Sequence, residues 1–319
     1  MPQILATVVP QNKVSANTPR GEPRLQPWHI TLFFLTLLAG GGYPGTVGVK
    51  GTPAMTYDPI KYHKKGHIGH ITLNRPEAGN AIDADMAIAL GEICRKINQD
   101  PEVRVVVIDG SGDKAFCAGE DLLQLSQSAL GDGQSLDSLR DIALRYNVTE
   151  AVYGIECPVI AAINGDALGA GLALVLACDL RIASAEALLG VGDLAQECLP
   201  ANGLTQFLPR IVGRGKAMEL LLTAETVEAS EALNIGLVHR VVPRQDVVSE
   251  ASKMAEDMAS KAPVALRYAK EAINKGMDLT LEQALRLECD LYMVLHTTHD
   301  RTEGIKAFRE KRKPTFKGE

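Results

Sequence analysis

The sequence has no excess of basic residues. It contains 33 Lys and Arg against 39 Asp and Glu, which gives a net charge of −6. Sequence-independent binding of nucleic acid needs a basic surface that displaces counterions from phosphates, so we expect no nucleic-acid partner. A GxSxG turn, which presents a serine nucleophile in many hydrolases, is also absent from the sequence.

Cysteine pairs of the CxxC type are absent as well. The six cysteines are scattered along the chain and stand mostly among apolar residues, at Cys94, Cys117, Cys157, Cys178, Cys198 and Cys289. This pattern is typical of small buried side chains and not of a zinc site or a disulfide framework. We therefore predict no metal site and a reducing compartment, the cytoplasm.

Residues 1–54 contain only a short apolar run. Ile30–Ala39 is well below the roughly 20 residues that span a bilayer, so we expect no membrane segment. The run also starts late, behind a polar and Pro-rich lead, which is unlike a signal peptide. We interpret residues 1–54 as a disordered extension that precedes a natural start at Met55, while targeting to an organelle by this extension stays an open alternative.

From Tyr57 onward, strand and helix patterns alternate along the chain. The predicted strands are His67–Leu73, Val103–Ile108, Val159–Ile163, Leu180–Ala183 and Val238–Val242. The predicted helices are Ile82–Ile97 with Asp83 as its N-cap, Leu168–Ala177, Val247–Ser260, Pro263–Lys275, Leu281–Leu295 and His299–Glu310. This alternation predicts an α/β fold with parallel strands, followed by a helical tail that forms a cap or an interface.

Two glycine-containing turns follow two of the predicted buried strands, over residues 109–122 and 164–171. At a junction between a strand and a helix, backbone amides lack a partner within the helix and point outward at its positive end. Two such turns that converge can hold an oxygen that gains negative charge. Taken singly, either turn is better explained as a tight connection between elements.

Together the motifs of this chain resemble the crotonase superfamily, the enoyl-CoA hydratase and isomerase family. The resemblance rests on Asn74-Arg75-Pro76, Asn80-Ala81, Ala115–Leu122, Pro158–Gly165, Ala167–Gly171, Ala177–Arg181 and Phe308–Pro314. It implies a crotonase-like spiral of ββα units over residues 55–250, which carries the acyl-CoA site. It further implies a C-terminal helical trimerisation and CoA-capping region over residues 251–319, in a homotrimer or hexamer.

The resemblance also assigns roles to residues in the two turns. The backbone N–H groups of Glu120 and Ala170 are expected to form an oxyanion hole for the carbonyl oxygen of an acyl-CoA thioester. Further substrate-binding residues implied by the resemblance are Ala118, Gly119, Asp121, Leu122, Gly169, Gly171 and Lys311. Coenzyme A is then part of the substrate, and no separate cofactor is expected.

The catalytic acids depart from the family pattern. One glutamate of the water-activating pair in hydratases is replaced by Ala173, and the position of the other corresponds to Asp193. Asp193 is therefore the expected proton carrier. Glu197, four residues later, is a candidate for a relocated acid, and Glu120 adds a further carboxylate beside the turn.

The resemblance thus predicts an enzyme that stabilises a thioester enolate and acts as a hydratase or isomerase. Losing one acid lowers the rate of such a reaction without abolishing the shared enolate step. The alternatives are a CoA-thioester hydrolase or decarboxylase of the same fold, and a non-catalytic acyl-CoA-binding protein. Retention of Asp193 favours catalysis, because a protein that only binds the thioester does not need a carboxylate beside it.

Overall fold

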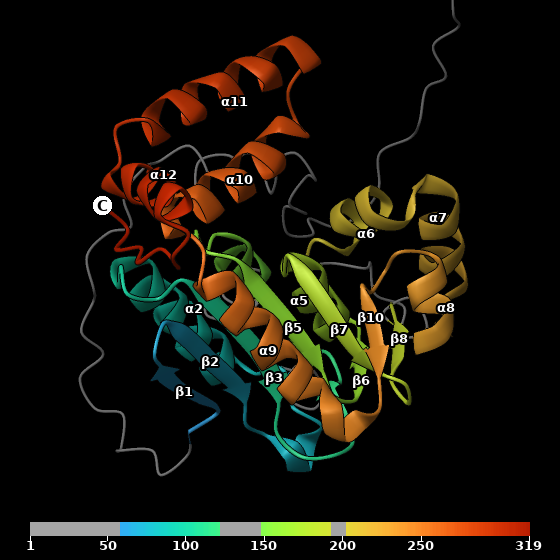
Figure 1. Cartoon of the computed structure of the whole chain (residues 1–319). Coiled ribbons are helices and arrows are strands. Elements are labelled where there is room, and N and C mark those ends of the chain that lie inside the picture. Colours follow the sequence, from blue (N-terminus) through green and yellow to red (C-terminus); the bar gives the residue numbers. More distant parts are fainter. Residues whose placement is uncertain (1–57, 122–147, 193–201) are drawn as a thin grey trace, which may run out of the picture. The chain divides into compact units, whose positions relative to one another are not determined.

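The computed structural model describes residues 58–121, 148–192 and 202–319, which form two β-sheets and a set of helices (Figure 1). The large sheet contains β1 (Ile60–Lys65), β2 (Ile68–Leu73), β3 (Val105–Gly110), β5 (Val159–Ile163), β7 (Leu180–Ser184) and β10 (Arg240–Val242). The small sheet contains β4 (Ala115–Cys117), β6 (Asp166–Leu168), β8 (Leu188–Gly190) and β9 (Thr226–Glu228). The helices are α2 (Ala84–Gln99), α5 (Ala170–Ala177), α6 (Leu204–Val212), α7 (Arg214–Thr223), α8 (Ala229–Asn234), α9 (Val247–Ala259), α10 (Pro263–Gly276), α11 (Leu281–Leu295) and α12 (His299–Glu310), with 3-10 turns at Pro76–Ala78 and Arg244–Asp246.

The large sheet is almost entirely parallel. Its strand order is β1-β2-β3-β5-β7-β10, and only the first pair, β1 with β2, is antiparallel. In the small sheet, of order β4-β6-β8-β9, the first three strands are parallel to one another. The parallel pairing predicted from the alternation of strands and helices is confirmed.

Consecutive strands are shared between the two sheets in a repeating way. In each of the pairs β3 and β4, β5 and β6, and β7 and β8, the first strand joins the large sheet and the second joins the small one. A helix follows the second and third of these pairs, α5 after β6 and α6 after β8. The chain thus winds through successive ββα units, which is the spiral predicted from the family resemblance.

Buried side chains fill both faces of the large sheet. Along β3, Val106 and Ile108 face the core shared with α2 and α5, while Val105 and Val107 face α9. Figure 1 shows α9 lying across one face of this sheet and α2 and α5 on the other. A strand buried on both faces needs the continuous apolar run that the sequence contains here.

The C-terminal helices make a separate layer. No residue of α11 is buried, and Figure 1 shows this helix lying away from the sheets. None of the helices in the residues described by the structure combines the length and the apolar character needed to cross a membrane. The boundary expected after residue 54 lies outside the described residues and stays a prediction.

Candidate active site

The two glycine-containing turns leave the small sheet side by side. The first follows β4 and the second follows β6, and these strands are parallel neighbours in which Ala115 pairs with Asp166 and Cys117 with Ala167. The carboxyl ends of parallel neighbours lie at the same edge of a sheet. The two turns, which are about fifty residues apart in the sequence, are therefore neighbours in the fold.

Backbone packs directly on backbone where the two turns meet. Gly119 has φ +105°, and a Cβ placed there would lie 3.1 Å from the Leu168 carbonyl oxygen and 3.7 Å from the Ala170 nitrogen. A Cβ on Gly171 would lie 2.2 Å from the Cys117 carbonyl oxygen. Glycine is needed at both positions because any side chain would push α5 away from the end of β4.

The backbone amides of Ala170 and Glu120 lie at this junction. Ala170 is the first residue of α5, so its N–H has no acceptor within the helix. Ile82 forms a parallel bridge with Glu120. The Ile82 N–H donates to the Gly119 carbonyl at 2.8 Å, and the Asp121 N–H donates to the Ile82 carbonyl at 3.0 Å. The Glu120 N–H therefore points to the side opposite Ile82. In the described part of the chain neither N–H donates to a backbone carbonyl outside the regular elements. Two such donors on adjacent turns can stabilise an oxygen that gains negative charge.

A partly buried arginine, Arg75, holds the first turn in place. Arg75 donates from Nη2 to Asp121 at 2.9 Å and from Nη1 to the Ala81 carbonyl at 2.8 Å, and it pairs with Asp83 at 3.0 Å. Asp83 in turn caps α2 by accepting from the Met86 N–H. The Asp121 carboxylate, expected to contact substrate, is thus engaged in holding the turn that carries Glu120.

Two buried asparagines hold the connection between β3 and β4. Asn80 accepts from the Arg75 N–H and donates to the Ser111 and Ala115 carbonyls, each at 2.9 Å. Asn164 accepts from the Gly110 N–H and donates back to its carbonyl at 2.7 Å. Both residues lie in motifs that carried the family resemblance, yet periodicity gives no indication of this bracing role.

The helix that carries the second turn supplies no acid. Ala173 is completely buried in the core, among the apolar residues of α5. The expected proton carrier Asp193, the candidate acid Glu197 and the substrate-binding candidate Leu122 all lie outside the described residues. Their roles stay predictions.

Glu120 does place a carboxylate at the site. Its half-buried side chain accepts a hydrogen bond from Nδ2 of Asn202 at 3.0 Å. Asn202, which starts the segment before α6, is 6% exposed, has φ +53° and was not anticipated from the sequence. A single asparagine beside a glycine reads as a turn residue, so no sequence signal distinguishes it.

The neighbouring thiol is not a nucleophile. Cys117 ends β4 directly before the first turn, and burial raises the pKa of its thiol to about 12. The thiolate is the reactive form of cysteine, so this side chain stays neutral at physiological pH. Its role is to fill the core beneath the turn.

The remaining predicted residues fall into two groups. Gly169, the N-cap of α5, and Gly171 lie in the second turn, and Ala118 is exposed in the first. Lys311 belongs to the C-terminal layer instead, where it is exposed, has φ +55° and ends α12. The structure thus brings together the residues of the two turns, and it places Lys311 in a different part of the fold.

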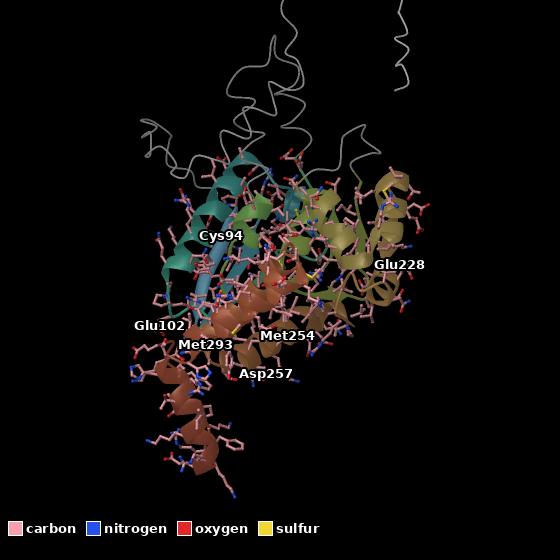
Figure 2. The ribbon with its side chains drawn as sticks, turned by 90° about the horizontal axis from the view of Figure 1, so that it is seen from above. Cys94, Glu102, Glu228, Met254, Asp257 and Met293 are labelled. Atoms are coloured by element: carbon pink, nitrogen blue, oxygen red, sulfur yellow. The ribbon has the colours of Figure 1, made fainter. Side chains whose placement is uncertain are left out.

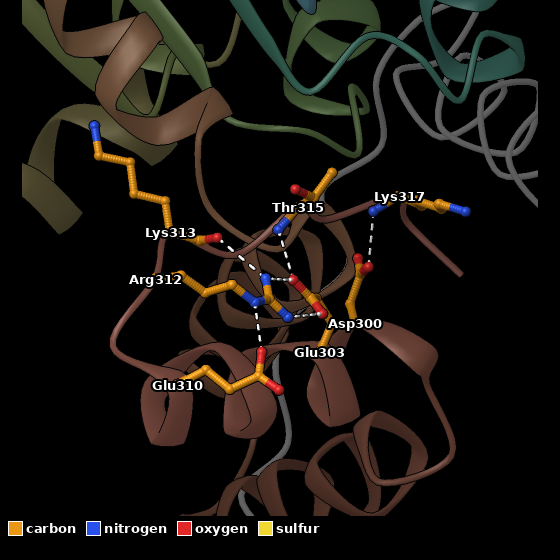
Figure 3. A network of polar contacts seen from close by, with 7 residues as sticks. All are labelled: Asp300, Glu303, Glu310, Arg312, Lys313, Thr315 and Lys317. Atoms are coloured by element: carbon orange, nitrogen blue, oxygen red, sulfur yellow. Dashed lines mark hydrogen bonds and ion pairs between the residues drawn. The ribbon is translucent and has the colours of Figure 1, made fainter.

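Polar contacts fix the chain that follows Lys311, from Arg312 to Lys317 (Figure 3). Arg312 donates to both carboxylate oxygens of Glu303, at 2.6 and 2.9 Å, and Glu303 also accepts from the Thr315 N–H. The Arg312 guanidinium and the Thr315 N–H lower the pKa of Glu303 to about 2. Asp300, which is 3% exposed, accepts from the Lys317 and Gly318 N–H groups. The basic C-terminal stretch therefore has a defined conformation.

Comparisons with known proteins agree with one another. Residues 63–319 match the family described as Enoyl-CoA hydratase/isomerase. A protein of Bacillus subtilis, YngF, whose name assigns it to that family, is 43% identical over 80% of this chain and 96% of its own. The crotonyl-CoA hydratase of Syntrophomonas wolfei is 37% identical, with 82% and 99% covered. The crystal structure of an enoyl-CoA hydratase from Bacillus anthracis superimposes with a TM-score of 0.78 at 40% identity, covering 82% of this chain and all of that one.

Proposed function

Because the chain belongs to the enoyl-CoA hydratase/isomerase family and is an acyl-CoA-processing enzyme, we propose that it adds water to the double bond of a 2-enoyl-CoA thioester. The observation that carries this proposal is the junction of the two turns, where, within the described residues, the N–H groups of Glu120 and Ala170 donate to no backbone carbonyl outside the regular elements. Relatives named as hydratases support the choice of hydration.

In this proposal both N–H groups donate to the thioester carbonyl oxygen. When water adds to C3, the electron pair of the double bond moves through C2 to this oxygen and forms an enolate. Each donor is expected to stabilise that charge by roughly 3 kcal/mol, because it is already oriented before the reaction. Arg75 contributes by holding the first turn rigid through Asp121.

Asp193 is the proposed proton carrier at C2, with Glu197 as the alternative. Ala173 cannot transfer a proton, so the enzyme works without the acid that hydratases of the family place on this helix. A general acid or base contributes about 10² to 10⁴ in rate. Lys311 and the ordered basic stretch around it are proposed to contact the phosphates of the CoA nucleotide.

We further propose that the protein is a homotrimer or hexamer. The exposed side chains of the C-terminal helices include large apolar residues, among them Ile273, Met277, Leu281, Leu285 and Met293, which is labelled in Figure 2. Exposed apolar surface of this extent indicates an interface. The free cysteines of the described residues, four of them buried, support the proposal of a reducing compartment such as the cytoplasm.

The test is incubation of the purified protein with a panel of 2-enoyl-, 3-enoyl- and saturated acyl-CoA thioesters, with products identified by mass spectrometry. Hydration adds the mass of one water to a 2-enoyl-CoA. An unchanged mass with a shifted double bond would instead identify an isomerase, and release of free CoA would identify a hydrolase. Recovery of every thioester unchanged would leave only binding and contradict the proposal.

Isomerisation of a 3-enoyl-CoA is the second candidate, and a specific observation favours it. A single carboxylate suffices to move a proton between two carbons, and Ala173 removes the second acid of the hydratase pair. The two candidates share the oxyanion hole and differ in whether a water molecule is bound and activated.

A further inference from the structure

An unexplained polar contact lies beside the first turn. The carboxylate of Glu120 accepts from Nδ2 of Asn202 across 82 positions in sequence, and Asn202 is 94% buried. The direction of this hydrogen bond is fixed by chemistry, since an ionised carboxylate has no proton to donate and must face the NH₂ group. The amide oxygen of Asn202 therefore points elsewhere.

Within residues 58–121, 148–192 and 202–319, that oxygen has no hydrogen-bond partner. Among the residues the structure describes, Asn202 Oδ1 is one of few buried side-chain atoms left unpaired. An unsatisfied buried acceptor costs about 1–3 kcal/mol, so it is seldom retained without a use. Asn202 also adopts φ +53°, a region that asparagine tolerates better than most side chains. A buried acceptor without a partner indicates that a donor binds there.

The distance to Glu120 identifies the donor. The oxygen and nitrogen of an amide are about 2.2 Å apart, so Asn202 Oδ1 lies within about 5 Å of Glu120 Oε1. One water molecule that donates at about 2.8 Å to two acceptors joins atoms roughly 4.5 Å apart. Two acceptors at this separation suit a molecule with two donated hydrogens, and water is the smallest such molecule.

We propose that Glu120 and Asn202 bind and activate the water molecule that adds to the substrate, in place of the acid lost at Ala173. This inference rests on the proposed hydratase function. Glu120 is suited to the role because its own N–H is the proposed donor to the thioester oxygen, so that donor and the carboxylate belong to one residue. Asn202 orients both the carboxylate and the water.

Atoms and electrons are conserved in this step. The water oxygen forms a bond to C3 while Glu120 takes one of its protons, and the electron pair of the C2–C3 double bond moves to the thioester oxygen as an enolate. The enolate then takes a proton at C2 from Asp193. Glu120 loses its proton to solvent and Asp193 regains one, so that one water molecule has been added.

The two carboxylates thus have separable tasks. Hydration requires Glu120, whereas exchange of the C2 protons of a saturated acyl-CoA with solvent requires only the oxyanion hole and Asp193. Glu120→Gln keeps the backbone N–H and removes the base. Asn202→Gly removes the amide while keeping a residue that accepts a positive φ.

The experiment compares these variants with wild type and with Glu228→Gln, a control at an exposed position far along the chain (Figure 2). We measure hydration of a 2-enoyl-CoA, exchange of C2 protons of a saturated acyl-CoA in D₂O, and the Kd of that saturated thioester. We expect kcat for hydration to fall by about 10² or more in Glu120→Gln and by about tenfold in Asn202→Gly. Exchange and Kd should stay within about threefold, and the control should match wild type.

The three possible negative results can be told apart by hydration and by C2 exchange. If wild type hydrates a 2-enoyl-CoA and both variants hydrate it equally well, the water site is wrong while the proposed function stands. If hydration and C2 exchange fall together in Glu120→Gln, this residue is the enolising base and the division of tasks is wrong. If wild type hydrates no 2-enoyl-CoA, the proposed function fails and the water site fails with it.

Discussion

Replacing Gly171 by alanine should damage the active site without adding any polar or charged group. The new Cβ would lie 2.2 Å from the Cys117 carbonyl oxygen and 2.8 Å from the Cys117 Cβ. Both atoms belong to the buried end of β4, which cannot swing aside as a flexible side chain would. The first turn of α5 must therefore move by about 1 Å before these contacts reach van der Waals distances.

The magnitude follows from that displacement. Forcing an extra methyl into a packed core costs about 1–3 kcal/mol of unfolding free energy. Ala170 directly precedes Gly171, so its N–H moves with the helix turn and loses its alignment with the Glu120 N–H. Loss of one oxyanion donor lowers kcat by about 10² to 10³. We expect a folded protein with reduced Tm and a kcat reduced by at least 10².

The assay measures kcat for the thioester reaction together with thermal unfolding. Gly91→Ala is the matched control, since Gly91 is within α2 and a Cβ there meets nothing within 4 Å. That control should be as active as wild type and slightly more stable, by about 0.5–1 kcal/mol, because alanine favours the helix. If Gly171→Ala keeps wild-type kcat and Tm, the close approach of α5 to β4 does not build the site, and the reasoning is refuted.

Three further variants test other parts of the account. Asp300→Ala removes the buried acceptor for the Lys317 and Gly318 N–H groups. It should lower the free energy of unfolding by roughly 3 kcal/mol and expose the C-terminus to proteolysis. An unchanged digestion pattern would contradict this. Burial raises the pKa of Asp109 above its ordinary value of 3.8, so the folded state binds this proton more tightly and loses stability as the pH rises. Asp109→Asn should therefore raise Tm at pH 7 and leave it unchanged near pH 3 in calorimetry, and a lower Tm at pH 7 would show that the ionised group is stabilised. Leu285→Glu, on the exposed α11, should dissociate the proposed oligomer in size-exclusion chromatography, whereas an unchanged elution volume would place the interface elsewhere.

Long elements could be predicted from the sequence because their apolar residues recur at the spacing of a helix or a strand. Asp83 caps α2 as expected, and the predicted strand Val159–Ile163 and helices Leu281–Leu295 and His299–Glu310 match the observed bounds. The small sheet could not be predicted in this way, since its strands are three residues long and contain no period. β1 was missed because its lysines and histidine interrupt the apolar alternation.

The site was predictable where motifs encode it and not where it depends on distant contacts. The glycine turns could be read because close backbone approach demands glycine, and the family they indicate is confirmed. Asn202 reaches Glu120 across 82 positions, and only the fold brings these residues together. The ion pairs of Arg75 with Asp83 and Asp121 could not be predicted for the same reason, because they join three segments of the chain.

Isotope-edited infrared spectroscopy can show whether two backbone N–H groups polarise the thioester carbonyl. The sample is a bound 2-enoyl-CoA that is labelled with ¹³C at that carbonyl. Two hydrogen bonds, from the N–H groups of Glu120 and Ala170, would weaken the C=O bond. We expect a carbonyl stretch at clearly lower frequency in the complex than in aqueous solution, with the shift reduced in Gly171→Ala. A bound thioester whose carbonyl frequency equals that in water would contradict this.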